Sequence, residues 1–288
     1  MKKHYDILFL AMSCNDPFFE MSRKVVHDTW AKDIIEDKYP GVGFFSYTSS
    51  GSADEYIKNY CMYVNAPDDI AHTYTKTIRA LKMLKDRGVD WDCVVRTNTS
   101  TYINVPNMID FVNKSKETGI GLTSFHAFDL ALGTFTCPLP AGWLMCMSGH
   151  YTNILLEKID ELDENNPNWL TDSLKQCASV NDDVLFGVFR EYLNSTYGFN
   201  IPFREINWKK YGRHYKSFIR NPFIQSPLER EGIYSGSQYT NPDDVRDSIA
   251  LQVRLPGVSG PYRCIELEHM YELHEAYKNI CYTNCRCI

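Results

Sequence analysis

Apolar and polar positions along the chain alternate between short apolar runs and amphipathic stretches, a pattern typical of an α/β protein. The clearest amphipathic stretch is Ile70–Arg87, whose apolar residues recur at steps of three and four and which Gly88 follows as a left-handed cap. The other predicted helices are Met21–Ala31, Pro106–Lys114, Tyr151–Leu162 and a helix from Asn181 to about Leu193. The predicted strands are Tyr5–Ala11, Val42–Tyr47, Trp91–Val95 and Gly142–Met147. Strands that alternate with helices predict a mostly parallel sheet.

Composition and charge narrow the class of protein. Of 288 residues, 44% are hydrophobic and 23% are charged, which is enough to form a core and excludes wholesale disorder. The net charge of -6 argues against general binding to nucleic acid or to a membrane surface. No apolar run approaches the roughly 18–20 residues of a spanning helix, so we expect no integral membrane segment.

The cysteines give little evidence of a disulfide framework or a metal site. Ten cysteines are scattered along the chain, and without a signal peptide we expect reduced thiols and a cytoplasmic protein. Three of them, Cys281, Cys285 and Cys287, are close together near the C-terminus, but their spacing matches no zinc pattern and their role stays open.

Five short motifs occur in a fixed order between the first predicted strand and residue 195. They are R-K-V-V-H-D-T-W at Arg23–Trp30, Y-T-K-T at Tyr74–Thr77, R-T-N-T-S-T-Y-I-N at Arg96–Asn104, P-A-G-W-L-M-C-M-S at Pro140–Ser148 and D-D-V-L-F-G at Asp182–Gly187. Together they resemble the motifs R-x-x-I-R-x-T-W, N-L-T-x-K-T, K-T-D-D-D-x-F-V-N, P-x-G-x-G-Y-x-x-S and E-D-V-x-x-G. These belong to the beta-1,3-galactosyltransferases and Fringe-like glycosyltransferases (glycosyltransferase family 31).

This resemblance implies a GT-A-like nucleotide-binding sandwich with a mixed, mostly parallel central sheet. We see no linker or repeat, so we expect a catalytic core over residues 1–199 and an irregular extension over 200–288 that completes the acceptor and diphosphate side. The implied activity is inverting transfer of a sugar, in the hexosyltransferase class, from a UDP-sugar donor to a hydroxyl of an oligosaccharide or glycoconjugate acceptor. Family members of animal cells carry a membrane anchor, for which this sequence gives no sign.

The third motif departs from the family in a way that bears on metal binding. Asn98, Thr99 and Ser100 replace its aspartate triad, and His27 replaces the second arginine of the first motif. Because neutral side chains are weak ligands for a hard cation, we expect no cofactor and no metal, or Mn²⁺ or Mg²⁺ bound only loosely. We then expect Arg213, His214 and Lys216 of the basic run Trp208–Arg220 to neutralise the diphosphate. The alternative is that this run is a solvated surface.

The remaining site residues follow from the resemblance and from strand ends, where α/β proteins bind ligands. Asp183 matches the aspartate of E-D-V and is the predicted catalytic base. Contacts with the acceptor or sugar are expected from Asp182 and Trp143, although Trp143 could equally be a core residue. Donor binding is expected at Ser13, Arg23, Asn98, Thr99 and Ser100.

Two alternatives stay open. Asp182 and Asp183 could simply be acids in the first turn of a helix, where the dipole favours negative charge. That dipole lowers a carboxylate's pKa, whereas a neighbouring carboxylate raises it. The sequence therefore leaves open whether the pKa of Asp183 is raised or lowered. The second alternative is a catalytically silent carbohydrate- or nucleotide-binding protein on a GT-A scaffold, which the loss of the triad favours.

Overall fold

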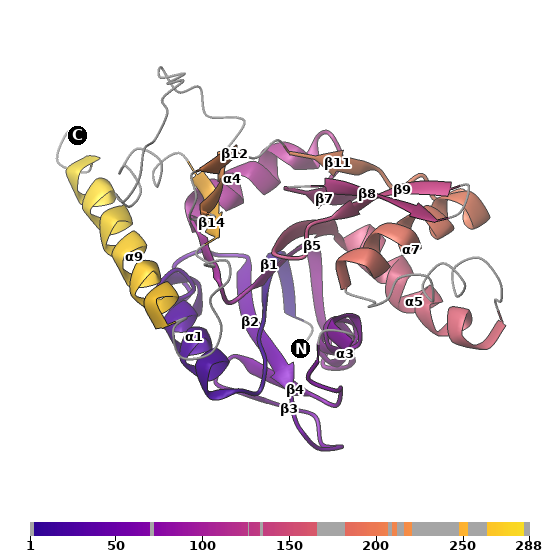
Figure 1. The fold of residues 1–288 in the computed structure, drawn as a ribbon, viewed down its shortest axis with the longest axis horizontal. Coiled ribbons are helices and arrows are strands. Elements are labelled where there is room, and N and C mark those ends of the chain that lie inside the picture. The colour runs from indigo at the N-terminus through magenta and orange to yellow at the C-terminus, as the bar shows by residue number, and fades with distance from the viewer. Residues whose placement is uncertain are drawn as a thin grey trace. The chain divides into compact units, whose positions relative to one another are not determined.

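The computed structural model describes residues 3–69, 72–125, 127–132, 135–165, 182–206, 209–211, 216–220, 248–252 and 264–284 (Figure 1). Two compact units are built from interleaved segments of the chain. The first contains Met1–Asn15, Tyr39–Asn98 and Thr118–Ile206, and the second contains Asp16–Lys38, Thr99–Glu117 and Asn207–Ile288. The division into residues 1–199 and 200–288 stays a prediction.

The first unit is built on an eight-stranded sheet with the order β11-β7-β10-β5-β1-β2-β4-β3. Four neighbouring pairs are parallel: β1 with β2, β1 with β5, β2 with β4, and β7 with β11. The other three pairs are antiparallel, so the predicted α/β class with a mixed, mostly parallel sheet is confirmed. The strands are β1 (Lys3–Met12), β2 (Val42–Ser49), β3 (Tyr56–Lys58), β4 (Cys61–Val64), β5 (Val89–Asn98), β7 (Leu122–Ser124), β10 (Leu144–Ser148) and β11 (Phe203–Glu205).

Three helices pack with this sheet into one hydrophobic core: α3 (Thr73–Asp86), α5 (Gly149–Asn165) and α7 (Asp182–Tyr197). The apolar stripe predicted from periodicity accounts for α3, because Leu81 and Leu84 are fully buried against the sheet. Gly88 has a φ of 74°, the left-handed conformation expected at the end of this helix.

Two hairpins of the first unit were missed by the sequence analysis. β3 and β4 are too short to show a period, and their turn depends on positive φ angles at Asn59 and Tyr60. Stacking of Tyr56 on Tyr63, with ring centroids 4.5 Å apart, holds the two strands together. The second hairpin pairs β8 (Ala127–Leu132) with β9 (Phe135–Pro140).

The second unit combines segments from three parts of the chain. Its four-stranded antiparallel sheet has the order β12-β13-β14-β6, so β6 (Thr101–Ile103) pairs with a strand about 150 residues later in the chain. The other strands are β12 (Lys209–Tyr211), β13 (Lys216–Arg220) and β14 (Ser248–Gln252), and the helices are α1 (Pro17–Asp28), α2 (Lys32–Ile35), α4 (Val105–Lys116) and α9 (Cys264–Asn284).

Helix α1 begins four residues before the predicted Met21. Asp16 caps it by accepting a hydrogen bond from the Phe18 N–H, and Pro17 occupies the first turn. Helix α9 lies beside α1, and the Tyr271 hydroxyl donates to Asp28 at 3.3 Å. Across the described ranges, no helix combines the length and apolarity needed to cross a membrane.

Candidate functional site

The site begins where β1 and β5 end side by side in the first unit. Met12 is aligned with Asn98 in the parallel register, and Ser13 follows directly. The backbone N–H of Ser13 donates to the Tyr47 carbonyl of β2 at 2.8 Å, so the chain continues along the neighbouring strand. Ser13 and Asn98, both predicted to bind the donor, therefore lie at the same edge of the sheet.

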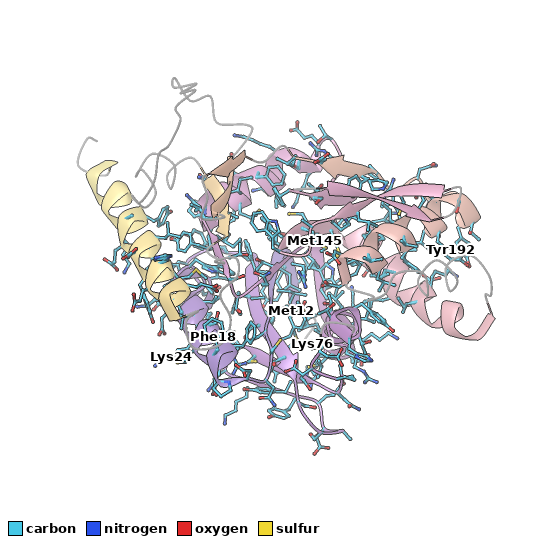
Figure 2. The ribbon with its side chains drawn as sticks, viewed as in Figure 1. Met12, Phe18, Lys24, Lys76, Met145 and Tyr192 are labelled. Atoms are coloured by element: carbon cyan, nitrogen blue, oxygen red, sulfur yellow. The ribbon has the colours of Figure 1, made fainter. Side chains whose placement is uncertain are left out.

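A buried lysine holds the segment after β1. The ammonium of Lys76 on α3 is fully buried and donates to the Ser13 carbonyl at 3.1 Å and to Asp68 Oδ1 at 2.7 Å (Figure 2). The other carboxylate oxygen of Asp68 accepts from the Asn15 N–H. A buried ammonium that is paired with Asp68 and also donates to the Ser13 carbonyl fixes this segment more firmly than a surface ion pair would.

The first carboxylate of the D-D-V motif belongs to a buried polar cluster. Asp182 is 2% exposed, and its Oδ2 lies 2.5 Å from Nη2 of Arg96 on β5 and 3.2 Å from the Thr77 hydroxyl. Its backbone N–H donates to the Thr73 hydroxyl at 3.0 Å. The Asp182 carboxylate is buried and paired with Arg96, and its contact with a sugar stays a prediction. These contacts connect the start of α7 to α3 and β5.

Arg96 carries unused hydrogen-bonding capacity. Its side chain is fully buried, which by itself lowers the pKa of the guanidinium, but the negative charge of Asp182 outweighs burial and the pKa is raised. Burial raises the pKa of Asp182, against the opposing effect of Arg96. Within the described ranges, Nε and Nη1 of Arg96 have no hydrogen-bond partner. Unpaired buried N–H groups are costly, so this guanidinium depends on its single carboxylate partner.

The second carboxylate of the motif has the environment of a general base. Asp183 is partly buried, and its Oδ1 accepts from the Val184 N–H at 2.9 Å while the Gly142 N–H donates to the same carboxylate. Burial raises its pKa to about 6, and the negative charge of Asp182 adds to the effect, outweighing those two hydrogen bonds. The sequence left the direction of the Asp183 pKa shift open, and the structure shows that the pKa is raised.

Gly142 allows β10 to approach this carboxylate. A Cβ at position 142 would lie 3.0 Å from Asp183 Oδ2, closer than a normal contact. Next to it, the carbonyl of Trp143 accepts from the Thr97 hydroxyl of β5 at 3.0 Å. Asp183 is thus connected through Gly142 and Trp143 to the end of the strand that carries Asn98. The Trp143 side chain is half-buried, and its contact with a sugar stays a prediction.

Three of the expected donor residues belong to the second unit. The Ser22 hydroxyl of α1 donates to the Thr99 carbonyl at 3.0 Å, which brings the first and third motifs together. Thr99 and Ser100 are both buried, and Arg23 is partly exposed. His27 is a neutral side chain at neutral pH, because burial and the charge of Arg23 lower its pKa to about 4.

The residues expected to neutralise the diphosphate are not tested by the structure. Arg213 and His214 lie outside the described residues, as does Trp208 at the start of the basic run. Lys216 is the first residue of β13, but its side chain is not among those described.

The sequence analysis missed the residues that hold the two aspartates in place. Arg96 and Thr77 belong to the third and second motifs, but nothing in those motifs marks them as partners of Asp182. Thr73, which accepts from the Asp182 N–H, and Tyr47, whose hydroxyl is hydrogen-bonded to Thr77, lie outside the motifs. One signal was present: Arg96 follows an apolar strand directly, and a charged residue in a strand that is buried on both faces needs a partner.

No protein-family model matches the chain, and no curated protein sequence matches it. Its structure is similar to the crystal structure of a glycosyltransferase involved in the glycosylation of the major capsid of PBCV-1, with a TM-score of 0.40 and 14% identity. The match covers 92% of this chain and 98% of that one. A similarity at this level is too distant to transfer a function.

Proposed function

We propose that this chain is an inverting glycosyltransferase that moves a sugar from a UDP-sugar to a hydroxyl of a glycan acceptor. The observation that carries the proposal is the environment of Asp183: a partly buried carboxylate whose pKa is raised to about 6 and which is held at the start of α7 by its neighbours. A general base works best when its pKa lies near the working pH. The five-motif resemblance supplies the substrate class, and Asp183 falls on its catalytic position.

In the proposed reaction, Asp183 accepts the proton of the acceptor hydroxyl as its oxygen attacks the anomeric carbon. The bond from that carbon to the diphosphate breaks on the opposite face, which gives inversion and leaves UDP with its added negative charge. Asp182 remains bound to Arg96, and its charge helps keep the Asp183 pKa high. Ser13 and Asn98 at the strand ends are proposed to hold the donor.

We propose that the diphosphate charge is countered without a metal held by the third motif. Asn98, Thr99 and Ser100 offer amide and hydroxyl oxygens, which bind a divalent cation far more weakly than carboxylates do. Arg213, His214 and Lys216 are the proposed counter-charges. Mn²⁺ dependence of the reaction that disappears on replacing Ser100 would contradict this part of the proposal.

The test is slow hydrolysis of a panel of UDP-sugars in the presence of EDTA, in which water takes the place of the acceptor hydroxyl and UDP and free sugar are released. The wild-type protein should release UDP at a rate that rises as Asp183 ionises, through about pH 6. Asp183→Asn should abolish release and leave UDP binding, measured by calorimetry, nearly unchanged. Retained turnover in this variant excludes Asp183 as the base.

A catalytically silent carbohydrate- or nucleotide-binding protein is the second candidate, favoured by the missing aspartate triad. It predicts UDP or glycan binding with no UDP release by the wild type at any pH. The sugar, the acceptor and the linkage stay open under either function.

A further inference from the structure

A second group of polar side chains lies at the other end of β1 and β5. His4 and Asp6 are two residues apart on β1 and therefore point to the same face of the sheet. Asp92 of β5 lies opposite Asp6, between the aligned pairs Tyr5–Trp91 and Ile7–Cys93. The three side chains therefore project together from one face, whereas Asp183 and Asn98 lie near the carboxyl ends of the strands.

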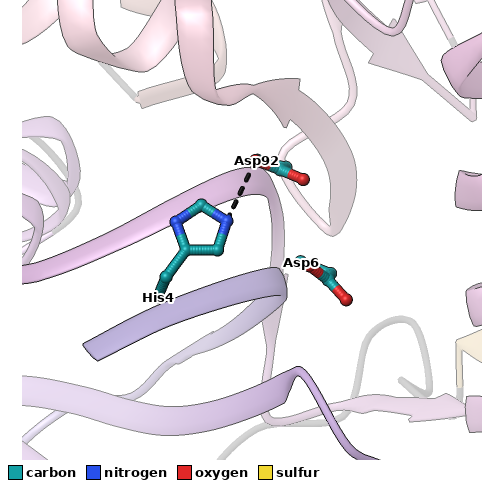
Figure 3. Close-up of side chains that lie close together, drawn as sticks. All are labelled: His4, Asp6 and Asp92. Carbon is teal, nitrogen blue, oxygen red and sulfur yellow. Dashed lines mark ion pairs between the residues drawn. The ribbon is translucent and has the colours of Figure 1, made fainter.

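The spacing of these side chains suits a single metal ion. His4 Nε2 lies 3.1 Å from Asp92 Oδ1, and one ligand atom from each of the three residues lies within 4.8 Å of the others (Figure 3). Metal bonds to imidazole nitrogen and carboxylate oxygen are about 2.0–2.2 Å long, which places bound ligand atoms about 3–4 Å apart. Small side-chain rotations would bring all three atoms to that distance.

Charge also favours a cation at this position. Two carboxylates approach one imidazole, and within the described ranges Asp6 has no ion-pair partner. Asp90, aligned with His4, is paired with Lys85, so that lysine is already engaged. Two carboxylates at this distance repel each other, and a divalent cation removes the repulsion.

The backbone of Gly41 holds Asp6 in position. The Asp6 N–H donates to the Gly41 carbonyl at 2.7 Å, and Gly41 has a φ of 76°. A Cβ at position 41 would collide with Asp6 Oδ2, so the carboxylate lies directly against the glycine. The Asp6 backbone is therefore held in place, while its exposed carboxylate can rotate toward a metal ion.

We propose that His4, Asp6 and Asp92 bind one divalent first-row metal ion through one imidazole nitrogen and two carboxylate oxygens, with water completing its coordination. One nitrogen and two oxygen ligands suit Mn²⁺ or Zn²⁺ better than Mg²⁺, which prefers oxygen alone. The ion joins the amino-terminal halves of two central strands, so its effect is on stability. The proposed sugar transfer does not depend on it.

Mn²⁺ is the probe, because the chain's cysteine thiolates would compete for Zn²⁺. The amount of free Mn²⁺ is measured by electron paramagnetic resonance at near-neutral pH for the wild type, Asp6→Asn and His4→Gln. The matched control is His72→Gln, because His72 Nδ1 lies 2.7 Å from Asp69 Oδ1 in an exposed histidine–carboxylate pair. No third metal-ligating side chain joins that pair in the described part of the chain.

The wild type and the His72→Gln control should bind Mn²⁺ at a site that is weakened by about tenfold or more in Asp6→Asn and His4→Gln. Mn²⁺ should also raise the melting temperature of the wild type and the control, but not of the two site variants. Because the three replaced side chains, His4, Asp6 and His72, are all largely exposed, melting in EDTA should be alike in all four proteins. Equal binding by the wild type and both site variants, or no binding by the wild type at millimolar Mn²⁺, overturns the proposal.

Discussion

Replacing Asp183 with asparagine should stabilise the protein while it removes the proposed activity. The carboxylate's pKa is raised from 3.8 to about 6, because burial and then the charge of Asp182 disfavour its ionised form. A raised pKa in the folded state means that ionisation costs stability, and a shift of this size corresponds to about 3 kcal/mol. Asparagine keeps the shape and the acceptor oxygen but never ionises.

The change in the free energy of unfolding caused by Asp183→Asn should depend on pH. Below about pH 4 the carboxyl is protonated in both the folded and unfolded states, so asparagine should change the free energy of unfolding little. Between about pH 4 and pH 6 the unfolded state releases its proton first, and the wild type loses stability relative to the variant. Above about pH 6 the advantage of the variant should be complete, at up to about 3 kcal/mol.

The assay is urea unfolding at about pH 4 and about pH 8, followed by tryptophan fluorescence, since Trp91 and Trp143 both belong to the first unit. Asp110→Asn is the control, because Asp110 forms an exposed pair with Lys114 at 2.9 Å and its loss should cost less than about 1 kcal/mol. A carboxylate that only supports the helix dipole would behave oppositely: its loss should destabilise the protein by about 0.3–1 kcal/mol. Destabilisation of Asp183→Asn at about pH 8 would refute the reasoning.

Four further substitutions, two of them combined, test the surroundings of the site. Asp182→Asn should lower the free energy of unfolding in urea by about 3–5 kcal/mol, because it leaves the buried Arg96 charge unpaired. The double variant with Arg96→Met should lose less stability than the two single variants added together. Gly142→Ala should lower UDP release about tenfold by displacing the Asp183 carboxylate, with the unfolding midpoint nearly unchanged; an unaltered rate would contradict that contact. Lys76→Met should speed amide hydrogen exchange at residues 13–15, and unchanged exchange would show that the buried lysine does not hold that segment.

Local patterns were sufficient to predict the elements that carry the first unit. The run Tyr5–Ala11 and the stripe of Ile70–Arg87 correspond to β1 and α3, because a long buried strand and a long amphipathic helix each repeat their period several times. The two missed hairpins contain strands of three to six residues. In strands this short, the turn and the cross-strand pairs decide the structure, and neither shows as a period.

The candidate site was predictable only in part, because its residues meet through tertiary contacts. The motif resemblance was enough to single out Asp183 and Asn98, and both are found near the carboxyl end of β5. The ion pair between Asp182 and Arg96 joins residues 86 positions apart in the chain, and no local pattern predicts it. The direction of the Asp183 pKa depends on how deeply the carboxylate is buried, which sequence spacing does not give.

A crystal structure of the protein with an unreactive UDP-sugar analogue would test the central claim most directly. The account predicts a nucleotide at the carboxyl ends of β1 and β5, within hydrogen-bond distance of Ser13 and Asn98, with the sugar beside the Asp183 carboxylate. A nucleotide bound elsewhere, with Asp183 away from the anomeric carbon, would contradict it.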